Sequence, residues 1–235
     1  MSSSSSDHKI SLLLLNGGVG SRLALDIPKQ FHEVNGHPIM AYTLIAASKI
    51  AAISEIVLNA PEGHEARTRE ILDHYAGGKP VTLVEAGRSR QQSVYRLVEG
   101  ATNPRVLIHE TARPMVTQAM FQALIDHEED NVGYFDDIPF SMCRVDRKTH
   151  TVSKNVRREK VFNIQLPQKF DRATLAAAHK TALKKGVTFT EDAVMVHKMT
   201  DAKVHVLPGD PRNIKVTTQN DLITISQLIQ ADRIP

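Results

Sequence analysis

The segment Ile10–Phe31 (ISLLLLNGGVGSRLALDIPKQF) constrains the fold of this chain more than any other stretch. It opens with an apolar run broken by one serine, a pattern typical of a strand that is buried on both faces of a parallel sheet. The run stops at the glycine-rich stretch Asn16–Gly20, and two cations follow, Arg22 and, directly after a proline, Lys29. The first regular element is therefore a buried strand that leads into a glycine-rich, positively charged loop.

This loop has the composition of a polyphosphate site. Gly17, Gly18 and Gly20 allow the backbone to approach a ligand closely and to point its N–H groups at phosphate oxygens. It is not a Walker loop, because no Gly-Lys-Ser/Thr follows, and it lacks the third glycine of the dinucleotide fingerprint. A tight strand–helix turn is the alternative, but a turn gains nothing from a second cation held beyond a proline. We therefore interpret the loop as a polyphosphate-binding loop flanked by Arg22 and Lys29.

Apolar runs alternate with helical patterns along most of the chain, which predicts an α/β protein. Strands are expected at 10–15, 55–60, 80–86, 106–109 and 203–207, and helices at 39–50, 65–75, 93–99, 118–126, 173–185, from the capping residues 190–192 to 199, and 220–231. Regular structure of unassigned type is expected at 162–170. The fold class that follows is a Rossmann-like, mainly parallel sheet with helices on both faces. Ligands bind at the carboxyl ends of the strands in such sheets, so we expect the polar residues there to form one site.

The alternating pattern breaks at about 136–160. Short β-like pieces at 138–145 and 149–154 surround a charged turn, Asp146-Arg147-Lys148, which predicts a β-hairpin arm standing off the sheet. An irregular surface hairpin and a dimer-forming arm are both compatible with this pattern. We expect a disordered N-terminal tail at 1–8, with its run of serines, and a single domain at 9–235 that includes the arm.

Composition excludes several classes of function. The net charge is only +3 and no basic run occurs, and aromatic residues make up 5% with no Trp, which argues against nucleic-acid binding. The single cysteine, Cys143, excludes an internal disulfide and fits a reducing compartment. There is no signal-peptide pattern and no apolar run of membrane-spanning length, so we expect a cytoplasmic protein without membrane contact.

The polar residues at the strand ends suit phosphoryl or nucleotidyl transfer. They are the cations Arg22, Lys29 and Lys215, the acid Glu110, and the donors Gly87 and Ser93. Such reactions depend mainly on positioning and on neutralising phosphate charge, and a carboxylate beside a sugar hydroxyl can also hold Mg²⁺. No Ser-His-Asp set is evident, so a covalent hydrolytic route is not supported.

Several of these residues also have an ordinary structural interpretation, and Arg22 and Lys29 could be surface charges only. Glu110 and Ser93 could cap helices, and Lys215 could be a solvated residue at the edge of the sheet. His109 is expected to be packed or hydrogen-bonded rather than catalytic.

Several motifs occur in the order found in one enzyme family. They are Asn16–Arg22 with Pro28-Lys29-Gln30, Gly87…Arg90…Ser93-Val94, His109–Pro114, Leu166-Pro167-Gln168 and Asn213–Thr217. From about Ile10 to Ile229, the chain resembles the cytidylyltransferases that make CDP-activated polyols. These are the 2-C-methyl-D-erythritol 4-phosphate enzyme of isoprenoid synthesis and the related ribitol-5-phosphate enzymes.

The resemblance implies a reaction in which the phosphate oxygen of a polyol phosphate attacks the α-phosphorus of CTP and releases pyrophosphate. Catalytic roles then fall on Arg22 and Lys29 at the triphosphate and on Lys215 at the α-phosphate, with Thr217 beside it in the substrate site. The implied CTP-binding residues are Asn16, Gly17, Gly18, Gly20, Gly87, Arg90 and Ser93, of which Gly87 and Ser93 would read the cytosine.

The resemblance also implies a metal ion and a second subunit. Glu110 would lie near the ribose, Mg²⁺ and the hydroxyls of the polyol, and Arg113 would brace that loop beside the substrate. Arg158 matches a basic residue that the arm lends to the substrate phosphate of the neighbouring subunit. The expected assembly is therefore a homodimer formed through the arm.

The chain departs from the family pattern at four positions. It has Asn16 where alanine is usual, Glu110 where aspartate is usual, Leu166 where threonine is usual, and Arg88 where the residue is often acidic or small. Loss of one hydrogen-bond partner can alter substrate discrimination strongly, so these changes bear on the choice of polyol more than on CTP. The alternatives are a sugar-1-phosphate nucleotidyltransferase that uses UTP or GTP and, because of Glu110 and Leu166, a non-catalytic nucleotide-binding relative.

Overall fold

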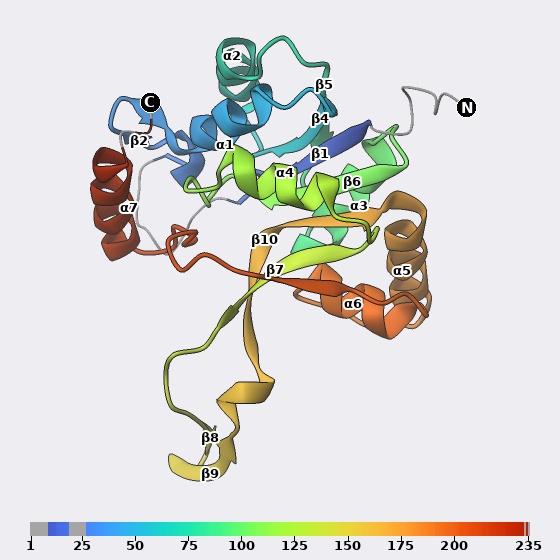
Figure 1. Ribbon diagram of the computed structural model, residues 1–235, viewed down its shortest axis with the longest axis vertical. Helices are drawn as coiled ribbons and strands as arrows, with labels where there is room; N and C mark the ends of the chain where they lie inside the picture. The colour runs from blue at the N-terminus through green and yellow to red at the C-terminus, as the bar shows by residue number, and fades with distance from the viewer. Residues whose placement is uncertain (1–8, 19–26, 233, 235) are drawn as a thin grey trace.

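The computed structural model describes residues 9–18, 27–232 and 234, and its centre is a seven-stranded sheet in the order β11-β7-β10-β6-β1-β4-β5 (Figure 1). The strands are β1 (Ile10–Leu15), β4 (Ile53–Ala60), β5 (Val81–Glu85), β6 (Arg105–Glu110), β7 (Val132–Asp137), β10 (Phe162–Asp171) and β11 (His205–Pro208). β1 pairs in parallel with β4 and β6, β4 with β5, and β7 with β11. β10 runs antiparallel to both of its neighbours, so the sheet is mainly parallel, as predicted.

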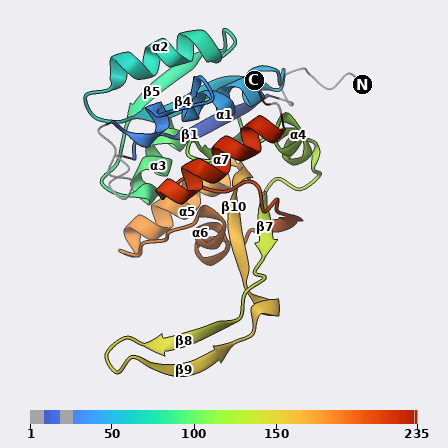
Figure 2. The same ribbon diagram turned by 90° about the vertical axis from the view of Figure 1, so that its left-hand side faces the viewer.

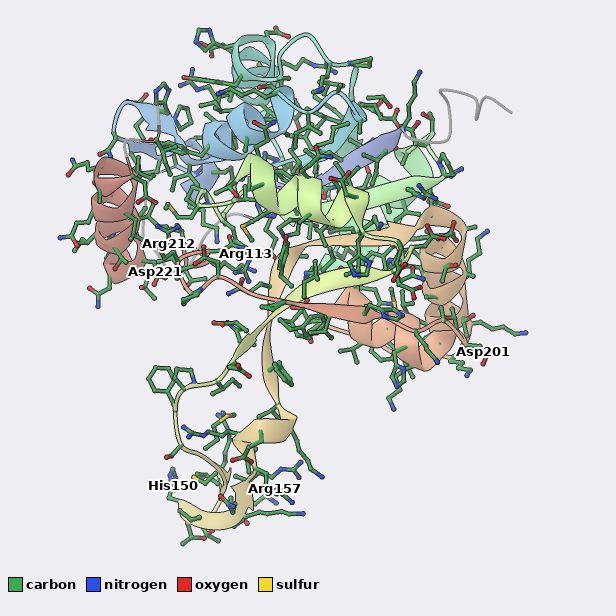
Figure 3. The ribbon with its side chains drawn as sticks, viewed as in Figure 1. Arg113, His150, Arg157, Asp201, Arg212 and Asp221 are labelled. Atoms are coloured by element: carbon green, nitrogen blue, oxygen red, sulfur yellow. The ribbon has the colours of Figure 1, made fainter. Side chains whose placement is uncertain are left out.

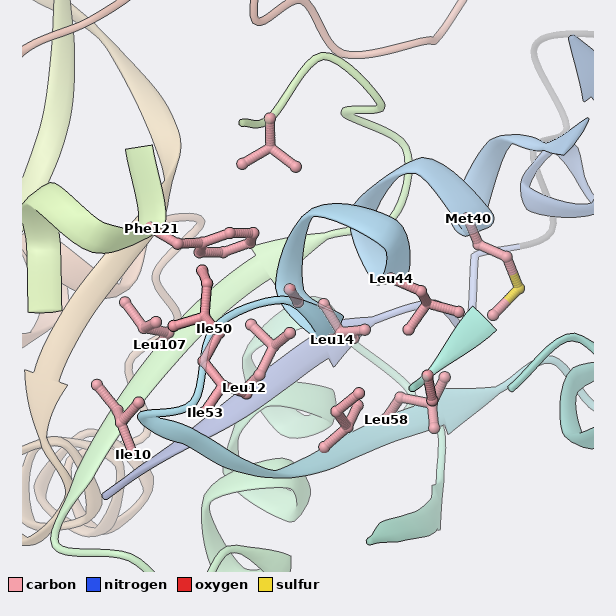
Figure 4. Packing of buried hydrophobic residues seen from close by; sticks show 14 of the residues in the cluster. Ile10, Leu12, Leu14, Met40, Leu44, Ile50, Ile53, Leu58, Leu107 and Phe121 are labelled. Atoms are coloured by element: carbon pink, nitrogen blue, oxygen red, sulfur yellow. The ribbon is translucent and has the colours of Figure 1, made fainter. Parts of the chain in front are cut away.

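Helices cover both faces of this sheet, because alternate side chains of its strands point to opposite sides. They are α1 (Ile39–Ser48), α2 (Glu65–Tyr75), α3 (Arg90–Gly100), α4 (Gln118–Asp126), α5 (Arg172–Lys184), α6 (Asp192–Met199) and α7 (Gln219–Ala231). Leu12 and Leu14 of β1 pack with residues of α1, α2 and α4 such as Leu44 and Phe121 (Figure 4). Leu13 packs on the other face with residues of α3, α5 and α6. The apolar run thus forms a strand buried on both sides.

The segment before α1 contains two short elements. η1 (Lys29–Phe31) is a single 3-10 turn, and β2 (Glu33–Val34) pairs with β3 (His37–Pro38) in a small hairpin. Asn35 and Gly36 form its turn with φ angles of 50° and 87°, the left-handed conformation that Asn-Gly favours. α7 closes this side of the molecule, where Ile225 and Ile229 pack with Val34 and Ile39.

The predicted arm is present and stands off the sheet. β8 (Met142–Asp146) and β9 (Thr151–Val156) form their own two-stranded sheet, which extends away from the body of the molecule (Figure 2). Nearly all of its residues are exposed, including Val145 at 51% and Val152 at 73%. η2 (Arg158–Lys160) links β9 to β10. The hairpin therefore contributes almost nothing to the core of its own chain.

Two strands of the sheet were not predicted from the sequence. β7 follows α4 without a strong apolar run, and β10 was expected only as a return of regular structure at 162–170. The expected tail at 1–8 lies outside the residues that the structure describes. Across the described part of the chain, no helix combines the length and the apolarity that crossing a membrane requires.

Candidate active site

A cavity of about 340 Å³ lies where the carboxyl ends of β1, β4, β5 and β6 meet. The chain order places β4 and β5 on one side of β1 and β6 on the other, so the cavity is at a topological switch point of the sheet. Its described lining is Leu15, Asn16, Gly17, Gly18, Lys29, Gln30, Asn59, Ala86, Gly87, Arg88, Ser89, Arg90, Ser93, Glu110, Thr111, Ala112 and Lys215. Segments far apart in the sequence thus converge on one site.

Nine of the predicted site residues line this cavity. They are Asn16, Gly17, Gly18, Lys29, Gly87, Arg90, Ser93, Glu110 and Lys215. Arg113 is adjacent to the cavity, whereas Thr217 and Arg158 do not line it. Gly20 and Arg22 lie outside the residues that the structure describes.

Contacts from two directions hold the start of the glycine-rich loop. The hydroxyl of Thr111 donates to Oδ1 of Asn16 over 2.7 Å, and Nε2 of Gln30 donates to the carbonyl oxygen of Asn16 over 2.5 Å. A Cβ on Gly17 would lie 2.7 Å from the Cβ of Ala86, closer than real Cβ contacts, so this position needs glycine. The loop therefore packs directly against the segment that follows β5.

The segment between β5 and α3 is folded around Ser93. The backbone N–H of Gly87 donates to Oγ of Ser93 over 2.9 Å, and a Cβ on Gly87 would lie 2.6 Å from the backbone nitrogen of Ser93. The helix cap is Ser89, whose hydroxyl accepts from the backbone N–H of Gln92, so the alternative that Ser93 caps α3 is wrong. Because Oγ of Ser93 accepts this bond, its own proton remains to be donated to another group. The predicted role of Gly87 and Ser93 in reading cytosine stays a prediction.

Glu110 lies at the end of β6 among three cations. Nζ of Lys215 is 2.9 Å from Oε1 and 2.8 Å from Oε2, while Nε of Arg90 and Nε of Arg113 each lie 3.6 Å from one of the oxygens. Burial alone would raise the pKa of Glu110, but Lys215, Arg90 and Arg113 outweigh it and lower this pKa to about 2. The side chain is thus an ionised carboxylate that lines the cavity, and Thr117, not Glu110, caps α4. Lys215 is paired with Glu110 and is not a solvated edge residue.

Arg90 contacts acids on α6 more closely than it contacts Glu110. Its Nη2 lies 2.8 Å from Oδ2 of the buried Asp192 and 3.9 Å from Oε2 of Glu191. These carboxylates outweigh the effect of burial and raise the pKa of Arg90. Arg90 lines the cavity, yet its guanidinium also joins α3 to α6 through these ion pairs.

Glu191 and Asp192, which the sequence predicted only as helix-capping residues, lie beside Arg90 at the cavity. Glu191 occupies the N-cap position of α6 but makes no capping hydrogen bond. Its pKa is raised by burial and by the nearby carboxylates of Asp192 and Glu110, against the opposing effect of Arg90. The only sequence signal was two consecutive acids before a helix, which is the ordinary pattern of a helix start.

The loop 213–217 brings Lys215 to the cavity. The backbone N–H of Val216 donates to the carbonyl oxygen of Ala112, and Nζ of Lys29 donates to the carbonyl oxygen of Val216 over 2.9 Å. Arg113 is also tied to this loop, because its Nη1 donates to the carbonyl oxygen of Asn213 over 2.8 Å. Lys29 is thus bound to the segment that carries Lys215, and both lysines line the cavity.

Two predicted substrate residues have local contacts elsewhere. The hydroxyl of Thr217 donates to Oδ2 of Asp221 over 2.7 Å, at the start of α7. Nη1 of Arg158 donates to the carbonyl oxygen of Pro139 over 3.0 Å at the base of the arm. Arg157, its neighbour, lies on the arm far below the labelled Arg113 (Figure 3). Arg158 therefore does not reach the cavity of its own chain.

Glu110 is the residue of the cavity that would hold the magnesium ion that the resemblance implies. Glu110 is the only carboxylate among the described lining residues, and the described chain has no group of three or more metal-binding side chains. Mg²⁺ is commonly bound through one or two carboxylates plus substrate phosphates, so one ionised glutamate is sufficient. Both of its oxygens, however, accept from Lys215.

Comparison with known proteins gives a consistent result. The model of the family described as 2-C-methyl-D-erythritol 4-phosphate cytidylyltransferase matches residues 10–231. Proteins of that name from Clostridium acetobutylicum and Clostridium beijerinckii are similar to this chain, with 31% and 33% identity. Each of these alignments covers 94% of this chain and 98% of the relative.

Solved structures agree with these sequence matches. The crystal structure of 4-diphosphocytidyl-2C-methyl-D-erythritol synthase from Anaerococcus prevotii matches with a TM-score of 0.82 and 26% identity, over 95% of this chain and all of that one. The 2-C-methyl-D-erythritol 4-phosphate cytidylyltransferase of Thermus thermophilus matches with a TM-score of 0.74 and 27% identity, over 94% and 99%. Because family model, sequence identity and fold agree over nearly the whole chain, this chain belongs to the 2-C-methyl-D-erythritol 4-phosphate cytidylyltransferase family of CTP-dependent nucleotidyltransferases.

Proposed function

We propose that this protein transfers the cytidylyl group of CTP to 2-C-methyl-D-erythritol 4-phosphate and releases pyrophosphate. The observation that carries this proposal is the cavity at the carboxyl ends of β1, β4, β5 and β6, where Lys29, Lys215 and an ionised Glu110 meet the glycine-rich loop. Relatives covering nearly the whole chain carry the name of the methylerythritol enzyme, which favours this acceptor over ribitol 5-phosphate.

The chemistry follows from the charges around the cavity. An oxygen of the acceptor phosphate forms a bond to the α-phosphorus of CTP, and the bond from this phosphorus to the oxygen bridging to the β-phosphorus breaks. Pyrophosphate carries that oxygen and its electron pair away. Lys29 and Lys215 stabilise the negative charge on the transferring phosphoryl group and the leaving group, and the backbone of Gly17 and Gly18 cradles the phosphates.

The reaction is proposed to use Mg²⁺, which Glu110 and oxygens of the triphosphate would coordinate. When bound, the ion neutralises phosphate charge and holds the triphosphate in one geometry. Gly87 and Ser93 are proposed to recognise the base, since a backbone carbonyl accepts from the amino group of cytosine and the free hydroxyl proton of Ser93 is donated to a ring acceptor.

The second subunit is also part of the proposal. Arg158 lies outside the cavity of its own chain, and the arm that carries it exposes Phe140 at 74% and Val152 at 73%. An exposed hairpin with apolar side chains suits an interface with a second copy. In such a homodimer, Arg158 would contact the phosphate of the acceptor bound to the neighbouring subunit.

A coupled assay of pyrophosphate release tests the proposed function. Purified protein is incubated with Mg²⁺, one nucleoside triphosphate and one acceptor, and all combinations of CTP, UTP and GTP with methylerythritol 4-phosphate, ribitol 5-phosphate and a sugar 1-phosphate are compared. We expect turnover with CTP and methylerythritol 4-phosphate, and a CDP-polyol of the corresponding mass. Turnover only with UTP or GTP and the sugar phosphate, or CTP binding with no product from any acceptor, would contradict the proposal.

A further inference from the structure

Both oxygens of Glu110, the carboxylate that is proposed to hold the metal ion, are already paired with a cation. Nζ of Lys215 bridges both oxygens of Glu110 at 2.9 and 2.8 Å, and Arg90 and Arg113 approach the same oxygens to 3.6 Å. Glu110 is only 7% exposed, so little water screens these charges. A divalent cation that approached this carboxylate would be repelled by three positive groups.

Only one of the three cations can leave easily. The guanidinium of Arg90 is anchored to Asp192 at 2.8 Å, and that of Arg113 is nearly buried and donates to the carbonyl oxygen of Asn213. The side chain of Lys215 is 36% exposed and lines the cavity, and Glu110 is the one hydrogen-bond and ion-pair partner of its Nζ in the described structure. Lys215 is therefore the movable member of the cluster.

We infer that nucleotide and metal bind in a coupled order, in which the triphosphate draws Lys215 away from Glu110 and only then frees the carboxylate for a divalent cation. This inference rests on the proposed function, because a triphosphate must enter this cavity. A triphosphate carries more negative charge than one carboxylate and enters beside Lys29, whose ammonium group already contacts the residue after Lys215. The exchange therefore keeps Lys215 paired in both states, and Glu110 gains the metal in place of the ammonium group.

Binding of Mn²⁺ in the absence of nucleotide tests the first half of this order. Free Mn²⁺ is measured by its electron paramagnetic resonance signal with wild-type protein, Lys215→Met, and the double variant Lys215→Met/Glu110→Gln. We expect weak binding to the wild type and about tenfold tighter binding to Lys215→Met, about 1.4 kcal/mol. The double variant should lose this gain. Equal affinity of wild type and Lys215→Met, or a gain that persists in the double variant, would overturn the inference.

Binding of metal-free CTP tests the second half. Isothermal titration in the presence of EDTA compares wild type with Glu110→Gln, in which Lys215 has no carboxylate to leave, so CTP should bind about tenfold tighter. Glu85→Gln is the matched control, because Glu85 is an exposed acid paired with Arg96 outside the cavity, and it should match the wild type. Unchanged or weaker CTP binding by Glu110→Gln contradicts the inference. Absence of CTP binding by wild-type protein with Mg²⁺ would instead refute the proposed function, and the Mn²⁺ measurement would still decide the inference.

Discussion

Three of the positions at which the resemblance led us to expect a different residue lie in different physical environments. Asn16 is buried and joins the glycine-rich loop to Thr111, and Glu110 is held among three cations. The side chain of Leu166 is 2% exposed and packs in the apolar cluster that contains Leu13 and Ile108. Leu166 thus belongs to the core and not to the lining of the cavity, so its missing hydroxyl bears less directly on the choice of polyol than the sequence suggested.

Replacing Lys29 by methionine should reduce turnover strongly. The substitution keeps much of the length of the side chain but removes the charge beside the triphosphate, and loss of one such stabilising group costs about 10²–10³-fold in kcat. CTP affinity should fall less than kcat, because the backbone of the loop and Lys215 remain. Steady-state kinetics with CTP and methylerythritol 4-phosphate measure both quantities.

The control for this variant is Lys180→Met, which removes the same charge from an exposed position on α5. It should retain wild-type kinetics. Near-normal turnover of Lys29→Met would mean that the lysine is not placed at the reacting phosphates.

His109 should make the protein sensitive to mild acid. The ring is fully buried, and its Nε2 lies 3.2 Å from the carbonyl oxygen of Arg113. Burial and the charge of Arg113 lower the pKa of His109 to about 3, although the hydrogen bond to the carbonyl of Arg113 and the charge of Glu110 oppose this shift. In the unfolded chain the imidazole is protonated near pH 6.5, whereas in the folded protein it is protonated only near pH 3. The contribution of His109 to the free energy of unfolding is therefore complete above about pH 6.5 and falls by about 1.4 kcal/mol per pH unit between there and the folded pKa. Glu110, with its lowered pKa of about 2, adds a loss only below about pH 4.5.

Urea unfolding of wild type and His109→Gln at pH 7.5, 6.5 and 5.5 checks this. Glutamine retains a donor for the carbonyl of Arg113 but cannot be protonated, so the variant should lose less stability than the wild type between pH 6.5 and 5.5. His179 is unchanged in both proteins, and burial also lowers its pKa, so some sensitivity should remain. Identical pH slopes for the two proteins would contradict the prediction.

Elements with a strong hydrophobic periodicity were predictable from the sequence. Strands that are defined mainly by hydrogen-bond pairing with their neighbours were not. The range of α4 was predicted at its observed bounds, Gln118–Asp126, because an apolar face is bounded by Thr117, which caps it. β7 was missed because its residues Val132–Asp137 include a glycine and two acids, and only pairing with β10 and β11 makes them a strand. β10 runs antiparallel to β7 because the hairpin arm joins these two strands, but its pairing with β6 depends on how the elements pack.

The site was predictable as a location and less so as a set of contacts. The rule that ligands bind at the carboxyl ends of parallel strands brought Lys29, Ser93 and Glu110 together correctly. The pairing of Glu110 with Lys215 joins residues 105 positions apart, and the pairing of Arg90 with Asp192 depends on how α6 docks beside α3. Such contacts are set by packing of the elements, which no local pattern encodes.

The β8–β9 arm is the part of the chain through which we propose that two copies dimerise. Residues of β8 and β9 are almost entirely exposed, and the two strands pair only with each other. The hairpin neither packs on the core of its own chain nor lines the cavity, so contacts within the chain stabilise it little. Packing against a second copy would stabilise it. The free energy that holds the arm in place would then come from the interface and not from the fold of one chain.

Mixing two inactive variants tests whether Arg158 acts on the neighbouring subunit. Arg158→Ala removes the contribution of the arm, and Lys29→Met removes the contribution of the cavity, so each homodimer should have very low activity. In a mixed dimer, one cavity has its own Lys29 and receives Arg158 from the partner, whereas the other cavity lacks both. After exchange of subunits, random pairing should restore about a quarter of wild-type activity, because half of the dimers are mixed and half of their sites are complete. Activity that stays at the sum of the two separate variants, while sedimentation shows mixed dimers, would place the action of Arg158 within its own chain.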